Sequence, residues 1–229
     1  MNYAHFKKIT LLLVIFSLPF LVSASNIDNK TVYNSNIINE NKIAITFDDG
    51  PHPKLTPKIL DVLDKYDVKA TFFVIGVNVD NYPKPLIRAI KEGHEIGNHT
   101  DSHCILKSIK IEKIQKEINL CKRKIFDLTG YDVNMIRPPC GLYDKKLIDI
   151  AKKNNDKIIL WNIDTHDWAH MSSDDIANNV LKNIKGGDII LFHDYISGES
   201  NTVEALENLI PTLKDKGYEF VTVSQLLQK

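Results

Sequence analysis

Short apolar runs and amphipathic stretches alternate along the chain from residue 42 onward. The apolar runs are rich in β-branched and aromatic residues, which is typical of buried strands. They predict strands at residues 42–47, 70–75, 95–97, 134–136, 157–163, 188–192 and 218–223. Because these strands alternate with helical segments, the pattern predicts a parallel α/β fold.

Most segments between the strands repeat apolar residues every three or four positions, which predicts amphipathic helices. The longest covers residues 111–128 and ends at Gly130, with an apolar stripe of Ile111, Ile114, Ile118, Cys121, Ile125 and Leu128. Another begins at Thr56 and Pro57, an N-cap residue followed by proline at the first helical position. Further helices are expected at residues 86–91, 147–153, 176–184, 202–216 (interrupted by Pro211) and from Ser224 onward.

Polar motifs follow directly after several of the predicted strands. The carboxyl ends of parallel strands share one face, and this face carries the functional loops of such folds. We therefore expect the motifs to meet at one end of the sheet. The hydrophobic period alone fits both an incomplete barrel and an open sheet.

The first 24 residues have the pattern of an export signal. Lys7 and Lys8 form a positive start, residues 9–22 are mostly apolar, and residues 22–24 (Val-Ser-Ala) form a small-residue cleavage site. An uncleaved membrane anchor is the alternative, but the apolar run is short for a spanning helix and contains Pro19. We expect an exported protein without a stable membrane anchor. An arm at residues 25–41, irregular or forming one short strand, would precede a single domain at residues 42–229.

Composition narrows the choice of partners. The chain has 29 Lys and Arg against 29 Asp and Glu, and loss of the two leader lysines leaves a slight negative charge. No basic field is present for nucleic acid, so no such partner is expected, and the sequence does not specify an oligomeric state. Three cysteines are an odd count for an exported protein. Cys121 belongs to a helical stripe, whereas Cys104 and Cys140 flank polar motifs and could form a disulfide.

Two motifs carry the residue types of a metal site. Asp48 and Asp49 end the first predicted strand, and His99 and His103 lie four residues apart after the third. Two histidines and one carboxylate form the ligand set of a catalytic metal that keeps a position open for water. Asp48 would then be free to take a proton from that water. The two histidines could share one face of a helical turn, as in other zinc motifs. The ordinary alternatives are a structural Asp-Gly-Pro turn and structural histidines.

Arg137 stands before two prolines, which make a rigid strand exit. Its guanidinium could pair with Asp48 and keep that carboxylate ionised, or it could lie at the surface of a turn. The backbone N–H groups of Cys140 and Gly141 could stabilise an oxyanion.

His193 ends the most apolar of the predicted strands and is a candidate general acid. Asp164 or Asp167, after another strand, could orient it and raise its pKa. Leu191 could line a small apolar pocket, and Trp168 could stack on a sugar. The alternatives are a histidine that caps a sheet edge and a tryptophan of the core.

Together these motifs resemble those of polysaccharide deacetylases with a NodB-homology domain, carbohydrate esterase family 4. The resemblance covers nearly the whole chain after residue 40. It is carried by Thr-Phe-Asp-Asp-Gly-Pro at residues 46–51, His-Thr-Asp-Ser-His at 99–103, Arg-Pro-Pro-Cys-Gly at 137–141, Asp-Thr-His-Asp-Trp at 164–168 and Leu-Phe-His at 191–193. It implies a distorted (β/α) barrel of about seven strands.

The resemblance also implies roles for individual residues. A divalent metal, with zinc expected, would be held by Asp49, His99 and His103. Asp48 would be the general base, tethered by Arg137. His193 would be the general acid, tuned by Asp164 in preference to Asp167 because Asp164 lies nearer the strand end. The substrate would be contacted by Pro139, Cys140, Trp168 and Leu191. The family usually has an aromatic residue in place of Cys140, which puts one wall of the sugar site in question.

The activity implied is removal of N-acetyl groups from N-acetylhexosamine residues of a cell-wall or extracellular glycan, either peptidoglycan or a chitin-like polymer, with release of acetate. The alternatives are an O-acetyl esterase acting on xylan, a metal amidase acting on a small molecule, and a non-catalytic glycan-binding homologue. The last is disfavoured because a binding module has no need of Asp48 and His193 together.

Overall fold

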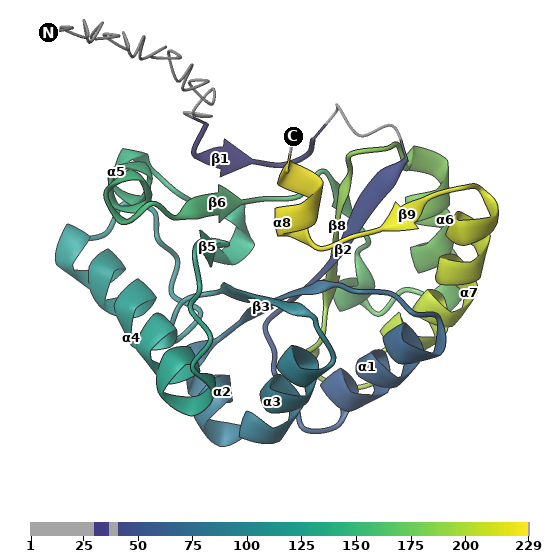
Figure 1. Cartoon of the computed structure of the whole chain (residues 1–229), viewed down its shortest axis with the longest axis horizontal. Coiled ribbons are helices and arrows are strands. Elements are labelled where there is room, and N and C mark those ends of the chain that lie inside the picture. The colour runs from purple at the N-terminus through teal and green to yellow at the C-terminus, as the bar shows by residue number, and fades with distance from the viewer. Residues whose placement is uncertain (1–29, 37–40, 229) are drawn as a thin grey trace, which may run out of the picture.

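The strands form one sheet that curls upon itself (Figure 1). In the computed structural model, residues 30–36 and 41–228 are described, so the predicted leader at residues 1–24 lies outside the described residues. The strand order is β1-β6-β5-β4-β3-β2-β8-β7, and β9 pairs separately with β2. The strands are β1 (Val32–Tyr33), β2 (Lys42–Asp48), β3 (Thr71–Val74), β4 (Glu95–Asn98), β5 (Met135–Ile136), β6 (Lys157–Ile159), β7 (Ile163–Asp164), β8 (Ile189–His193) and β9 (Glu219–Phe220).

All these pairings are parallel, as the alternation of strands and helices predicts. The predicted single strand at residues 157–163 is wrong. It forms two strands, β6 beside β5 and β7 beside β8, which lie near opposite ends of the strand order. Because only residues 160–162 join them, the two ends of the sheet must approach each other. The sheet is therefore a distorted barrel, and the predicted fold class is confirmed.

Helices lie around this curled sheet, all but the last of them on its outside (Figure 1). They are α1 (Leu55–Lys65), α2 (Gly76–Asn81), α3 (Pro83–Lys91), α4 (Ile111–Thr129), α5 (Lys145–Asn154), α6 (Ser173–Asn183), α7 (Thr202–Asp215) and α8 (Val223–Leu227), with 3₁₀ turns η1 (Pro139–Gly141) and η2 (Asp167–Ala169). In α4 the middle of the predicted stripe is buried, and Gly130 ends the helix in the left-handed conformation.

Three further local predictions are wrong, and one helix is not predicted. Helix α1 begins at Leu55, so Thr56 lies inside its first turn and does not cap it. Residues 76–81 form α2, for which no helix is expected from the periodicity. Helix α7 continues through Pro211. The last strand is shortened to the two residues of β9.

The core lies between the curled sheet and its helices. β8 is buried from Ile189 to Phe192, and Phe47 of β2 stacks on Phe72 of β3 with ring centroids 4.9 Å apart. Burial of each such side chain contributes roughly 1.5–3 kcal/mol, so the strands that carry the polar motifs are firmly fixed.

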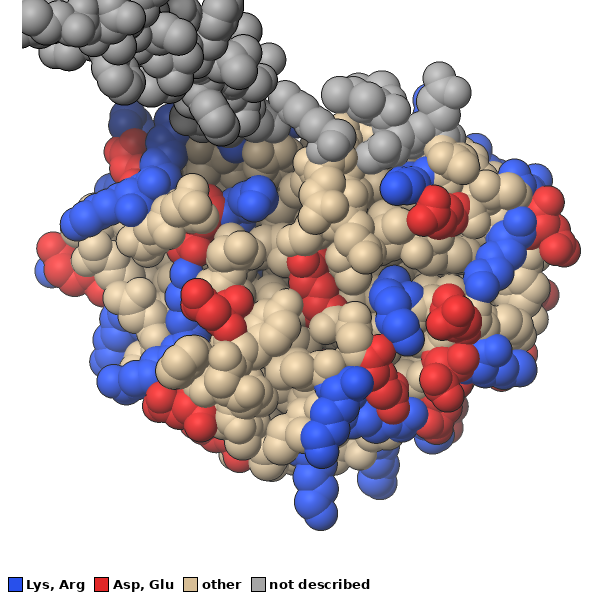
Figure 2. All heavy atoms as spheres, viewed as in Figure 1, with Lys and Arg blue, Asp and Glu red and all other residues tan. Residues whose placement is uncertain are grey.

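Lysines, arginines and acids are interspersed on the face shown in Figure 2. Among the described residues, no helix combines the length and the hydropathy needed to cross a bilayer.

Candidate active site

The polar motifs meet at the carboxyl ends of the strands, because the strands run parallel. Asp48 ends β2, Asp164 ends β7, His193 ends β8, and His99 directly follows β4. Asp48 and His193 are also direct partners in the pairing of β2 with β8. A cavity of about 500 Å³ opens there, lined by Asp48, Asp49, His99, His103, Cys140, Trp161, Asp164, Trp168, Leu191, His193, Tyr195, Ile196 and Ser197.

Asp49, His99 and His103 converge on one point. Oδ1 of Asp49 lies 3.3 Å from Nε2 of His99 and 3.2 Å from Nε2 of His103. The three potential ligand atoms, one from each residue, all lie within 4.8 Å of one another. The two histidines do not share a helical turn. They belong to a loop in which Thr100 and His103 have φ values of 69° and 57°.

This trio fits a metal. Nδ1 of His99 lies 2.8 Å from the carbonyl oxygen of Arg137, which can only accept a hydrogen bond. Nδ1 therefore carries the proton and Nε2 presents a lone pair to Asp49. The buried Oδ1 of Asp49 has no hydrogen-bond partner among the described residues. A carboxylate oxygen and two imidazoles, facing a cavity, are a ligand set for a divalent cation.

Arg137 spans the interior of the barrel and is fully buried, which excludes a surface position. Its guanidinium donates to Oδ1 of Asp48 at 2.8 Å and to Oγ1 of Thr46 at 2.7 Å. It also donates to the carbonyl oxygens of Ile159 and Leu160, at 3.2 and 3.1 Å, and lies 4.0 Å from the ring centroid of Phe73. The guanidinium thus fixes Asp48 through a charge-assisted bond in a site away from water.

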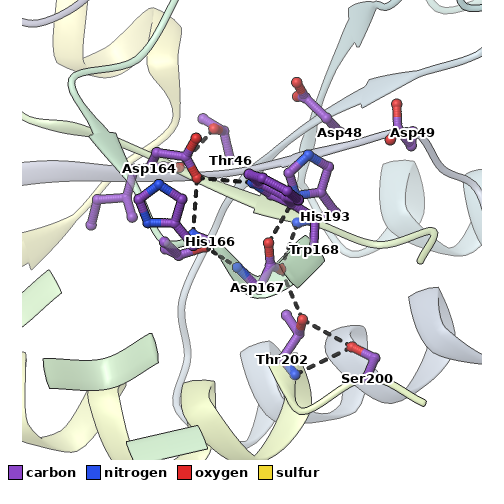
Figure 3. A network of polar contacts seen from close by, with 12 residues as sticks. Thr46, Asp48, Asp49, Asp164, His166, Asp167, Trp168, His193, Ser200 and Thr202 are labelled. Carbon is purple, nitrogen blue, oxygen red and sulfur yellow. Dashed lines mark hydrogen bonds and ion pairs between the residues drawn. The ribbon is translucent and has the colours of Figure 1, made fainter. Parts of the chain in front are cut away.

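His193 is held by Asp167 (Figure 3). Nδ1 of His193 lies 2.8 Å from Oδ1 of Asp167, whose Oδ2 accepts from the His193 backbone N–H at 2.9 Å and from the Thr202 hydroxyl at 2.8 Å. Burial alone would lower the pKa of His193, but the hydrogen bond and charge of Asp167 raise it to about 9. This pairing leaves Nε2 of His193 for the cavity, in the protonated form that a general acid requires.

The prediction that Asp164 partners His193 is wrong. Oδ1 of Asp164 accepts from the His166 backbone N–H at 2.9 Å and from Nε1 of Trp168 at 3.3 Å. His166 has a φ of 57°, and this left-handed residue starts the η2 turn, in which Asp167 is buried against His193. Asp164 thus lines the cavity and orients Trp168.

Three of the four predicted substrate-contacting residues line the cavity. Leu191 is buried in the middle of β8, Cys140 is exposed, and Trp168 is 51% exposed. Pro139 is buried at the start of η1 and does not belong to the lining. Cys140 follows it with a φ of 55°, a conformation that costs energy in a residue with a Cβ. Cys104, Cys121 and Cys140 are all free, so no disulfide joins the motifs.

Sequence reasoning missed Trp161 and Tyr195 as cavity residues. Trp161 lies inside the stretch predicted as one strand, so its position at a strand exit was hidden. Tyr195 follows His193 by two residues, and its ring lies edge-on to His52 with centroids 4.8 Å apart. The only feature of the sequence that could have indicated Tyr195 is its position just after the Leu-Phe-His motif at the end of β8.

Comparison with known proteins gives matches over most of the chain. The family model described as "Polysaccharide deacetylase" matches residues 36–158. A peptidoglycan-N-acetylglucosamine deacetylase of Bacillus cereus is 44% identical over 192 residues, which are 83% of this chain and 90% of that protein.

Solved structures agree with these sequence matches. The structure of a peptidoglycan N-acetylglucosamine deacetylase in complex with 4-naphthalen-1-yl-N-oxidanyl-benzamide superposes with a TM-score of 0.85 at 39% identity, covering 87% of this chain and 94% of that one. A family 4 acetyl xylan esterase from Clostridium thermocellum, in complex with a cobalt ion, gives a TM-score of 0.76 at 37% identity and covers 81% and 89% of the two chains.

Proposed function

Because the chain belongs to the polysaccharide deacetylase family, we propose that it hydrolyses the N-acetyl group of N-acetylhexosamine residues in peptidoglycan and releases acetate. The observation that carries this proposal is that three features meet in one cavity. The trio of Asp49, His99 and His103 lies beside Asp48. Arg137 holds Asp48, and His193, whose pKa is raised, is the partner of Asp48 in the neighbouring strand. The relatives named above support peptidoglycan as the polymer.

Asp49, His99 and His103 would hold a divalent metal, for which we propose zinc. When bound, this metal supplies Lewis-acid chemistry that polarises a carbonyl group and lowers the pKa of a water. The cobalt ion in the related esterase supports a transition metal in this family.

The chain's own residues divide the proton transfers between them. Asp48 takes the proton of the attacking water, while Arg137 holds Oδ1 of Asp48 through a charge-assisted hydrogen bond. His193 carries a proton on Nε2 and gives it to the departing amine, while Asp167 holds Nδ1. The backbone N–H of Cys140 donates to the oxyanion of the tetrahedral intermediate. Acetate and a free amino sugar leave the site.

The cavity walls would select an acetylated sugar. Leu191 provides an apolar contact for the acetyl methyl group, and Trp168 and Trp161 provide aromatic faces for the sugar ring. We propose that residues 1–24 direct export, which would bring the domain to its polymer.

The test is acetate release by the purified, zinc-loaded protein. It is incubated separately with peptidoglycan, chitooligosaccharides and acetylated xylan, with and without a chelator, beside the variant Asp48→Asn. We expect chelator-sensitive acetate from peptidoglycan and at least a hundredfold loss in the variant, which should still bind zinc. Acetate from xylan alone would establish the esterase instead. A metal-loaded protein that released no acetate from any polymer would indicate a binding homologue, and wild-type rates in Asp48→Asn would remove Asp48 as the base.

A further inference from the structure

The two histidines of the ligand trio are fixed in different ways. His99 is buried next to β4, and its ring is held by the Arg137 carbonyl oxygen at 2.8 Å. The His103 side chain is 40% exposed, and apart from Asp49 no hydrogen bond or ion pair holds its ring among the described residues. Its orientation therefore depends on the backbone of the loop that carries it, where Thr100 and His103 both adopt left-handed conformations.

That loop is attached to helix α4 through a buried carboxylate. Glu117 is 3% exposed, and its Oε2 accepts from the Ser102 backbone N–H at 2.9 Å. The Ser102 hydroxyl lies 3.1 and 3.0 Å from the two carboxylate oxygens. Lys113, one turn earlier in α4, donates to Oε1 at 2.6 Å and balances the charge. Burying a carboxylate is unfavourable unless donors compensate its charge. Here the donors are Lys113 and Ser102, and Ser102 is the residue that directly precedes His103.

A second contact attaches the same loop to α4. Oδ1 of Asp101 lies 2.7 Å from Nζ of Lys124, and the Asp101 carbonyl oxygen accepts from the Val77 backbone N–H at 2.9 Å. These contacts hold the residues before Ser102, so the bond to Glu117 is the last attachment of the loop before His103.

We propose that Glu117 is a positioning residue for the metal site. By holding Ser102 it fixes His103 in the orientation in which its imidazole faces Asp49 and His99. Glu117 does not touch the reacting atoms. The inference rests on the proposed function, because it requires that these three residues bind the metal.

The role of Glu117 is tested by measuring the affinity of the protein for zinc, not its turnover. The purified protein is freed of metal with a chelator, and zinc is titrated against a chromophoric competitor for the wild type and Glu117→Gln. Outer-shell changes typically weaken metal binding about 10- to 100-fold, and because Glu117 acts through a neighbouring residue we expect about tenfold. Cobalt added to the same proteins should show altered visible absorption bands in Glu117→Gln, since these bands report the ligand geometry. Glu112→Gln makes the same chemical change on the exposed side of α4 and should leave affinity and spectrum unchanged.

The outcomes separate the inference from the proposal on which it rests. Glu117→Gln with wild-type affinity and an unchanged cobalt spectrum overturns the role of Glu117. Should that variant unfold, Glu117→Asp, which keeps the charge beside Lys113 and shortens the reach to Ser102, must itself weaken zinc binding. Wild-type affinity in a folded Glu117→Asp would then reject the inference. If His103→Ala bound zinc as tightly as the wild type does, the metal site itself would be rejected, and with it the premise of this inference.

Discussion

Removal of the Arg137 guanidinium should strongly destabilise the fold. In Arg137→Met the buried Asp48 loses its charged partner, and the carbonyl oxygens of Ile159 and Leu160 each lose a donor. Removing one member of a buried pair typically costs about 3–5 kcal/mol. For a domain of this size that cost corresponds to a fall in Tm of roughly 6 to 20 °C. The loss is a large fraction of the roughly 5–15 kcal/mol by which domains are stable.

The assay is urea unfolding in the presence of chelator, because a bound metal would add its own stabilisation. Arg137→Lys keeps a positive charge but cannot reach all four acceptors, so it should fall between Arg137→Met and the wild type. In the double variant Asp48→Asn/Arg137→Met no unpaired charge remains, so its destabilisation should be smaller than the sum of the two single effects. A free energy of unfolding for Arg137→Met within about 1 kcal/mol of the wild type would refute the reasoning. So would strict additivity in the double variant.

Three further predictions concern the acid, the packing and the metal. Asp167→Asn removes the charge that raises the pKa of His193 to about 9. Because the proposed role of His193 requires its protonated form, the alkaline limb of kcat/KM against pH should move to lower pH, and an unmoved limb would contradict the assignment. A Cβ on Gly97 would lie 2.3 Å from Cδ1 of Phe73, so Gly97→Ala should cost about 1–3 kcal/mol in urea unfolding, and an unchanged midpoint would argue against this packing. Zinc at about 100 times its Kd should stabilise the wild type by about 2.7 kcal/mol, and Asp49→Ala should abolish that gain, whereas equal stabilisation would place the metal elsewhere.

The motifs at the strand ends could be predicted because two strong rules act together. Buried parallel strands are continuous apolar runs, and their ends are marked by the first polar residues. Asp48 and His193 stand at such ends, so their convergence follows once the strands are known to be parallel. The stripe of α4 was equally clear, because its buried positions recur at the helical period.

Tertiary context hid the other features. The apolar residues 157–163 read as one strand because periodicity cannot show that residues 160–162 leave β6 and cross to β7. Glu117 carries no sequence signal, since a glutamate on an amphipathic helix reads as part of the solvated face. It is buried only because the loop at Ser102 folds onto α4.

The choice between Asp164 and Asp167 shows which kind of information is missing. Proximity to the strand end favoured Asp164, yet a strand residue points to a side fixed by the pleat, and Asp164 lines the cavity beside Trp168. Asp167 reaches His193 because His166 turns the chain through a left-handed conformation. Hydrophobic periodicity does not reveal a single histidine in the left-handed conformation. Asp48 and His193 can therefore be found from the strand ends, whereas the partner of His193 depends on a single turn and needs the structure.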